Sequence, residues 1–173
     1  PIPDSEYNKL DLPKVYGLDF GYSNDPNAFV EIKYDGQYRY VNELLYETGL
    51  DNLALAQRLY ALGIRKNNLI IADTGNGGDL RIAEIRRGWK EFPELKFNIV
   101  PAIKGPGSIK FGINKIKSAK IYLTESSANG WNEYQEYKWL LDADKLPTDQ
   151  PVDKFNHIMD AIRYTELAKG SYF

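Results

Sequence analysis

The sequence predicts a single α/β domain whose β-sheet contains both parallel and antiparallel strands, with helices on its faces. Three strand candidates follow one another in an initial meander, and after them short apolar segments alternate with helical patterns. The length of 173 residues suits one domain with a sizeable core. No internal repeat or low-complexity segment is visible, so one mixed sheet flanked by helices is the expected architecture.

The first half of the chain supplies the meander, one helix and a strand expected to be buried on both faces. Asp35-Gly36 is a strong hairpin signal between two of the strands. Asp51 suits the N-cap of the helix, which Gly63 ends. The expected strands cover residues 15–20, 28–33, 38–46 and 68–72, and the apolar helix positions are Leu53, Ala56, Leu59 and Leu62.

The second half of the chain supplies the remaining strands and helices. A glycine-rich loop at residues 74–78 precedes a helix over residues 80–87, which Asp79 is expected to cap. Pro151 precedes the last and strongest helix, expected over residues 153–169. Between these two helices we expect strands at 97–103 and 120–123, a helix from Ser108, and a helix from Ser127 that carries Trp131, Tyr134, Tyr137 and Trp139.

Composition excludes several classes of protein. The chain has no cysteine, so disulfides, zinc ribbons and thiol nucleophiles are ruled out. Its apolar stretches are too short to cross a bilayer, and the acidic residues near its start do not fit a signal peptide. Residues 1–14 are polar and contain proline, so we expect them to form a linker that enters the domain.

The charge pattern points in two directions. A net charge of −2 does not favour a nucleic-acid binder. Residues 95–124, however, contain no acidic residue, which leaves a local strip of positive charge that could contact phosphates. The alternative is a solvated lysine face. The lysines of this strip are Lys96, Lys104, Lys110, Lys115, Lys117 and Lys120.

Two aspartates are candidate ligands at the ends of predicted strands. Asp19 interrupts an apolar strand, and a charged residue there needs a partner or a metal. The neighbouring glycines would let a ligand approach the backbone closely. Asp73 follows the buried strand 68–72, at the carboxyl end where ligands gather in such sheets. The alternatives are ordinary roles in turns, loops or helix caps, and the glycine-rich loop after Asp73 lacks the ending of an ATP-binding P-loop.

The third candidate group lies on the last predicted helix. Asp153, His157 and Asp160 are spaced to lie on one helix face, and His157 is the only histidine. Asp153 suits the N-cap, and the alternative for the other two is a surface pair. If Asp19, Asp73 and Asp160 converge, their oxygens suit Mg²⁺, and two such ions would support in-line phosphodiester hydrolysis.

Three segments resemble the nuclease domain of the terminase large subunit of tailed phages. The opening motif reads GLDFGYSNDPNA at residues 17–28. A second match reads KGPGSI at residues 104–109, followed by Gly112-Ile113 and residues 120–122. The third, NHIMDAIRY at residues 156–164, is similar to the family's His-x-x-Asp-Ala-x-Arg-Tyr segment and is the most specific. The matches keep the family's order and cover about residues 15–168.

The resemblance implies a ribonuclease H-like fold over residues 15–173 and a metal-dependent endonuclease that cuts concatemeric viral DNA during genome packaging. It implies two Mg²⁺ or Mn²⁺ ions on Asp19, Asp73 and Asp160, with His157 in support and the segment from Lys104 near the DNA path. The match is poorest after Asp73, where Asp79 could substitute as a ligand. The lysines expected to contact phosphates are Lys104, Lys110 and Lys115.

The resemblance also implies an ATPase domain before residues 1–14, a small terminase subunit and a portal as partners, and action in the host cytoplasm at the procapsid portal. No membrane association is expected. Two other functions fit the same residues. One is a related nuclease such as a junction resolvase, and the other is a non-catalytic module that clamps DNA or docks on the portal.

Overall fold

The computed structural model describes residues 1–137, 139–141, 143–151 and 156–173. One six-stranded sheet forms the centre of the molecule, in the order β5-β4-β1-β2-β3-β6. Strands β1, β2 and β3 run antiparallel, whereas β4 is parallel to β1, β5 to β4 and β6 to β3. This confirms the mixed sheet. The strands are β1 Lys14–Asp19, β2 Asn27–Asp35, β3 Tyr38–Glu47, β4 Leu69–Ala72, β5 Asn98–Pro101 and β6 Lys120–Leu123.

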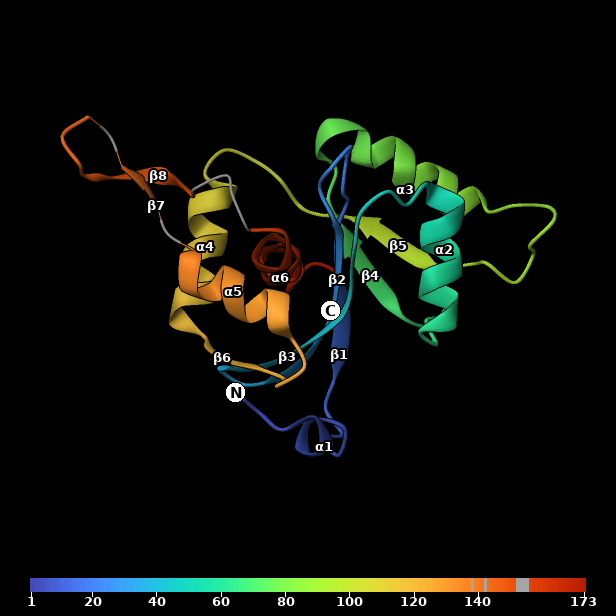
Figure 1. Cartoon of the computed structure of the whole chain (residues 1–173), viewed down its shortest axis with the longest axis horizontal. Coiled ribbons are helices and arrows are strands. Elements are labelled where there is room, and N and C mark those ends of the chain that lie inside the picture. The colour runs from blue at the N-terminus through green and yellow to red at the C-terminus, as the bar shows by residue number, and fades with distance from the viewer. Residues whose placement is uncertain (138, 142, 152–155) are drawn as a thin grey trace.

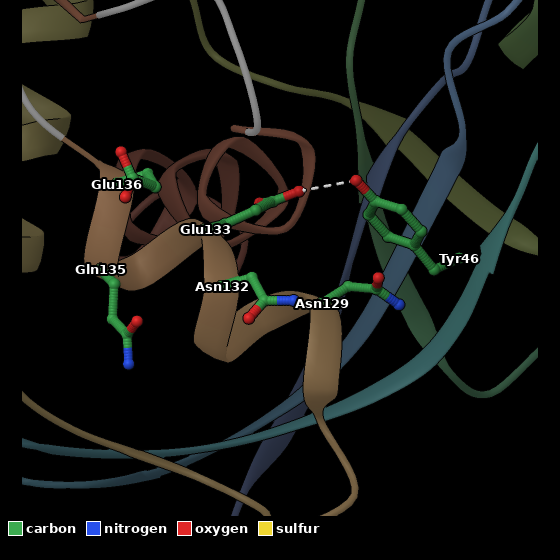
Figure 2. Close-up of a pocket in the computed structure, with 6 residues that line it drawn as sticks. All are labelled: Tyr46, Asn129, Asn132, Glu133, Gln135 and Glu136. Atoms are coloured by element: carbon green, nitrogen blue, oxygen red, sulfur yellow. Dashed lines mark hydrogen bonds between the residues drawn. The ribbon is translucent and has the colours of Figure 1, made fainter.

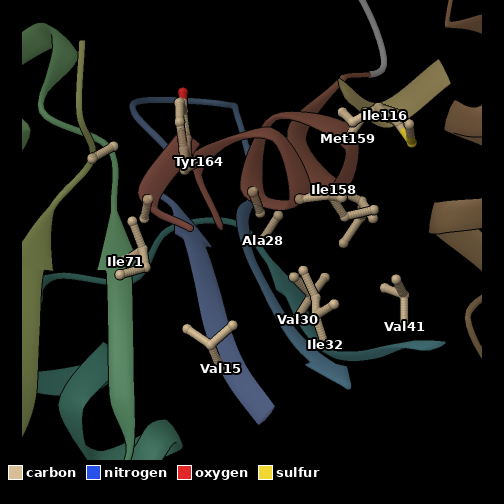
Figure 3. Close-up of a cluster of buried hydrophobic side chains, with 14 of the residues drawn as sticks. Val15, Ala28, Val30, Ile32, Val41, Ile71, Ile116, Ile158, Met159 and Tyr164 are labelled. Carbon is tan, nitrogen blue, oxygen red and sulfur yellow. The ribbon is translucent and has the colours of Figure 1, made fainter. Parts of the chain in front are cut away.

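Helices cover both faces of the sheet (Figure 1). Helix α6 (His157–Ala168) packs on one face, with α4 (Ser108–Ser118) and α5 (Ala128–Glu136) beside it. Helices α2 (Asn52–Ala61) and α3 (Gly78–Arg87) cover the other face. Each face has its own apolar core, and Figure 3 shows the α6 side, where Ile158 faces the valines of the sheet and Met159 lies beside Ile116 of α4.

Local signals in the first half of the sequence act as expected. The β2–β3 hairpin closes with Asp35 opposite Tyr38, and Gly36 adopts a φ of 54° in the turn. Asp51 caps α2 by accepting a hydrogen bond of 2.7 Å from the amide of Ala54. The buried face of α2 is rotated from the predicted one, because Leu55 is buried and Leu62 is 40 % exposed at the end of the helix.

Three predicted helix details are wrong. Asp79 does not cap α3: Gly77 occupies the N-cap with a φ of 86°, and the Asp79 side chain is exposed in the first turn. Helix α5 ends at Glu136, and Trp139 belongs instead to an unpredicted hairpin of β7 (Trp139–Leu141) and β8 (Pro147–Pro151). Helix α6 begins at His157, later than predicted, and Asp153 lies outside the described residues.

The N-terminal segment contacts the sheet. Ile2 forms a β-bridge with Thr124 beside the end of β6, and a short helix α1 (Asp4–Tyr7) follows. Tyr7 is almost fully buried and donates a hydrogen bond of 2.9 Å to Glu31 on β2. The segment predicted as a linker therefore packs on the domain that it enters. None of the helices in the described part of the chain combines the length and apolar character needed to cross a membrane.

Candidate metal centre

The three predicted aspartates lie on elements that meet at one edge of the sheet. Asp19 is the last residue of β1, and Asp73 directly follows β4, the parallel neighbour of β1. The amide of Asp73 donates a hydrogen bond of 3.0 Å to the carbonyl of Leu18, which fixes the two ends together. Asp160 comes from the first turn of α6. All three carboxylates are largely buried, with 10 to 15 % of each side chain exposed.

Asp19 is the central group of this cluster. Its carboxylate contacts Nδ1 of His157 at 2.9 Å and accepts a hydrogen bond of 3.2 Å from the Tyr164 hydroxyl. The pKa of Asp19 is raised from 3.8 to about 6, mainly by burial and also by the charges of Asp160 and Asp73, against the lowering effect of its hydrogen bond to His157. The pKa of His157 is raised in turn, mainly by its hydrogen bond to Asp19. Asp19 therefore lies in the field of both other carboxylates.

Asp160 has a basic partner on its own helix. Arg163 pairs with it at 3.0 Å, and the Tyr137 hydroxyl lies 3.5 Å from the same oxygen. Burial nevertheless raises the pKa of Asp160, and the charge of Asp73 adds to this. The lowering effect of Arg163 on the pKa of Asp160 is therefore smaller than the combined raising effects of burial and of the Asp73 charge.

The three predicted DNA-contacting lysines separate in the structure. Lys104 forms an ion pair with Asp73, and its ammonium group lies 5.5 Å from the centre of the Tyr164 ring. Lys110 and Lys115 lie on the exposed surface of α4, where Lys115 lies over the Phe111 ring. Lys104 is thus part of the carboxylate site, and the other two lysines are outside it.

The glycines beside Asp19 have a different role from the predicted one. A Cβ atom at Gly17 would lie 2.3 Å from the carbonyl oxygen of Ala161 on α6. At Gly21 it would lie 2.2 Å from the carbonyl oxygen of Asp25. Both glycines make room for the protein's own backbone and not for a ligand, and Gly17 lets α6 approach β1 closely enough for His157 to reach Asp19.

One buried acid near the site was missed at the sequence level. Glu133 on α5 is 1 % exposed and accepts hydrogen bonds from the amides of Ile158 (2.6 Å) and Met159 (3.1 Å) and from the Tyr46 hydroxyl (3.0 Å). Burial raises its pKa from 4.5 to about 7. It lines a cavity of about 450 Å³ together with Tyr46 and residues of α5 (Figure 2). The sequence did not point to Glu133, because aromatic residues dominate the pattern of α5. The role of Glu133 depends on its contact with α6, a different helix.

The donor set suits a hard divalent cation, but the carboxylates are held by protein groups. Carboxylate oxygens are the ligands that Mg²⁺ and Mn²⁺ prefer. Within the described residues, no group of three or more histidine, cysteine or acidic side chains is arranged to hold a metal ion. Asp73 is paired with Lys104, Asp160 with Arg163 and Asp19 with His157. Metal binding would therefore require at least one of these partners to move.

Comparison with known proteins identifies the family. Residues 19–166 match the family model described as "Terminase RNAseH like domain". The chain is 27 % identical over 178 residues to the terminase large subunit of Bacillus phage SPP1, covering 98 % of this chain and 40 % of that protein. It therefore spans about two fifths of the length of the curated relative that it matches.

Solved structures agree with this match. The nuclease domain of the SPP1 large terminase, crystallised with bound Mn, is 26 % identical with a TM-score of 0.73, covering 94 % of this chain and 89 % of that one. The large terminase nuclease of thermophilic phage G20c with bound magnesium has the same fold at 15 % identity and a TM-score of 0.58, covering 91 % of this chain and 82 % of that one. The chain therefore belongs to the family of ribonuclease H-like nuclease domains of phage terminase large subunits.

Proposed function

We propose that this domain is a metal-dependent endonuclease that cuts concatemeric double-stranded viral DNA during genome packaging. The observation that carries the proposal is the meeting of three largely buried carboxylates at one edge of the sheet, where the charges of Asp160 and Asp73 raise the pKa of Asp19 and the charge of Asp73 raises that of Asp160. Such a site gains free energy by binding cations. The SPP1 and G20c relatives are nuclease domains with bound Mn and magnesium, which supports the same chemistry here.

The residues have distinct roles in this proposal. Asp19, Asp73 and Asp160 would hold two Mg²⁺ or Mn²⁺ ions, with Asp19 shared between them. Bound there, such ions would supply the activation of a water and the stabilisation of the leaving oxygen in an in-line displacement. His157 would orient the Asp19 carboxylate through the contact at 2.9 Å. Lys104 would exchange its contact with Asp73 for one with a DNA phosphate when the site is loaded.

The remaining proposed contacts are with DNA and with other components of the packaging apparatus. Lys110 and Lys115 on the exposed side of α4 would contact phosphates, which position a duplex without reading its sequence. An ATPase domain of the same polypeptide, a small terminase subunit and the portal are the proposed partners. The proposed place of action is the host cytoplasm, at the procapsid portal.

The test is cleavage of supercoiled plasmid by the purified chain in the presence of Mn²⁺. Wild type is expected to nick and linearise the plasmid, and Asp19→Asn is expected to lower the rate by at least about 100-fold because it removes the central ligand. Asp35→Asn is the matched control, since Asp35 is an exposed aspartate at the turn between β2 and β3 and has no part in the proposed site. It is expected to keep the wild-type rate.

Three outcomes would redirect the proposal. Activity that survives Asp19→Asn would remove the central residue from the mechanism. Cleavage restricted to four-way junctions would indicate a resolvase. DNA binding without cleavage at any metal concentration would indicate a clamp or docking module.

A further inference from the structure

The first turn of α6 is held by a carboxylate from another helix. Glu133 on α5 accepts hydrogen bonds from the amides of Ile158 and Met159, two of the donors that an α-helix leaves unpaired at its start. The α6 N-cap residue, Asn156, makes no side-chain capping bond. Glu133 therefore supplies the cap, and its negative charge also suits the positive end of the helix dipole.

The same turn carries two residues of the carboxylate site. His157 and Asp160 flank the two amides that Glu133 binds. A hydrogen bond of 2.7 Å from the amide of Asp160 to the carbonyl of Asn156 closes the turn. Any shift of this turn would change the contact of 2.9 Å between His157 and Asp19.

Glu133 also connects this turn to the sheet. Its second carboxylate oxygen accepts a hydrogen bond of 3.0 Å from Tyr46 on β3 (Figure 2). Tyr46 pairs with Ala28, and Ala28 pairs with Asp19, so these three residues form one row across β3, β2 and β1. The Tyr46 ring meets the His157 ring at an interplanar angle of 66° and a centroid distance of 6.3 Å. Glu133 thus joins α6, which carries His157, to β3, which lies two strands from Asp19 on β1.

We propose that Glu133 is a positioning residue for the nuclease reaction, because it fixes the start of α6 so that His157 and Asp160 face Asp19. The catalytic part of this inference rests on the proposed function. Glu133 acts through His157 and Asp160 and does not contact the reacting atoms. Its loss should therefore reduce turnover and leave the binding of DNA unchanged.

The experiment compares wild type with Glu133→Gln and Glu133→Ala in two measurements. Imidazole ¹H–¹⁵N NMR spectra of the metal-free protein report His157 without ambiguity, because the chain has only one histidine. Both variants are expected to shift the His157 ring signals. In plasmid cleavage, kcat is expected to fall about 10- to 100-fold, as for a misplaced catalytic group, with KM for DNA within about two-fold of wild type.

Glu43→Gln is the matched control. Glu43 on β3 holds the start of α5 in the same way, accepting hydrogen bonds from the Gly130 amide (2.8 Å) and the Asn129 side chain (2.6 Å). Its loss should reduce stability by about 1 kcal/mol, as for other helix caps, without moving the His157 signals or kcat. If Glu133→Ala does not fold, Glu133→Gln keeps the side-chain volume and allows the same comparison.

The two proposals fail in different ways. His157 signals that stay at their wild-type positions in both Glu133 variants, or that move equally in Glu43→Gln, would overturn the positioning role. This result does not depend on nuclease activity. A wild-type protein that fails to cut DNA would instead overturn the proposed function, while the NMR comparison would still decide whether Glu133 positions His157.

Discussion

Helix α6 carries buried charge at both ends, and the two ends are built differently. Near its C-terminus Glu166 pairs bidentately with Arg39, and the side chains are 1 % and 8 % exposed. The remaining guanidinium donor reaches the carbonyls of Gly36 and Tyr38. Near its N-terminus Asp160 lies in a cluster with Asp19 and Asp73, and these three acids are paired with two permanent cations, Lys104 and Arg163, and with the titratable His157. One end is a balanced pair, and the other holds surplus negative charge whenever His157 is neutral.

The difference separates a structural ion pair from a binding site. A buried ion pair whose hydrogen bonds are all made does not favour the binding of a further ion. Removal of one partner leaves the other charge buried and uncompensated. A cluster with surplus negative charge raises the pKa of its own acids and favours any cation that enters.

The largest effect is expected at the balanced end. Arg39→Met should lower the free energy of unfolding by about 3–5 kcal/mol, because Glu166 would be left buried and unpaired. The double variant Arg39→Met/Glu166→Leu should recover much of this loss. Urea denaturation monitored by circular dichroism measures both values. A single variant as stable as wild type would show that the Arg39–Glu166 pair does not stabilise the fold.

A change of opposite sign is expected at the unbalanced end. Asp19→Asn removes a buried charge whose pKa is raised to about 6, and should raise the metal-free free energy of unfolding by about 1–2 kcal/mol. This expected gain in stability is smaller than the pKa shift of Asp19 alone would give, because the amide of the variant weakens the contact with His157. The same denaturation experiment applies. Destabilisation by Asp19→Asn would mean that the cluster is balanced after all.

The unbalanced end should also make stability depend on pH. Asp19, with a pKa of about 6, and Glu133, with a pKa of about 7, both bind protons more tightly in the folded state than in the unfolded state. Their stabilising contribution is complete below about pH 4 and is lost as the pH rises through about 7. Each kcal/mol lost corresponds to roughly 2–4 °C in melting temperature. The metal-free protein should therefore melt at a lower temperature at about pH 8 than at about pH 5.5, and Asp19→Asn should reduce the difference.

The smallest effect on stability is expected from charged residues that lie at neither end of α6. Lys115→Ala on the exposed side of α4 should change the free energy of unfolding by less than about 0.5 kcal/mol. If Lys115 contacts a phosphate, the variant should reduce the slope of log affinity for duplex DNA against log salt concentration by about one. Fluorescence anisotropy at several salt concentrations measures this slope. An unchanged slope would remove Lys115 from the DNA contact.

The sequence predicted the sheet better than the site. Period-two and continuous apolar patterns located the six strands, and Asp51 and Gly63 marked the ends of α2, because these signals depend on neighbouring residues. The β7–β8 hairpin was missed because the tryptophan and tyrosine residues before it continue the spacing of α5. Such periodicity does not specify where a helix stops.

At the site, the sequence pointed to three acids that the fold brings near one another, but not to their partners. Asp19, Asp73 and Asp160 are recognisable because a charged residue stands out at the end of an apolar strand or beside a buried helix face. The pairing of Lys104 with Asp73 and the cap from Glu133 to α6 join residues far apart in the chain. No local pattern encodes such contacts, since they arise only when the helices pack on the sheet.

Because Gly17 has no side chain, it determines which substitutions the carboxylate site tolerates. Because β1 and α6 touch there through main-chain atoms, the separation between the strand that ends in Asp19 and the helix that bears Asp160 does not depend on the size of a side chain at that crossing. Apolar residues elsewhere in the core can exchange without altering this spacing. An alanine at position 17 would instead push the helix off the strand and open the carboxylate cluster, so the smallest substitution in the sheet would be among the most disruptive.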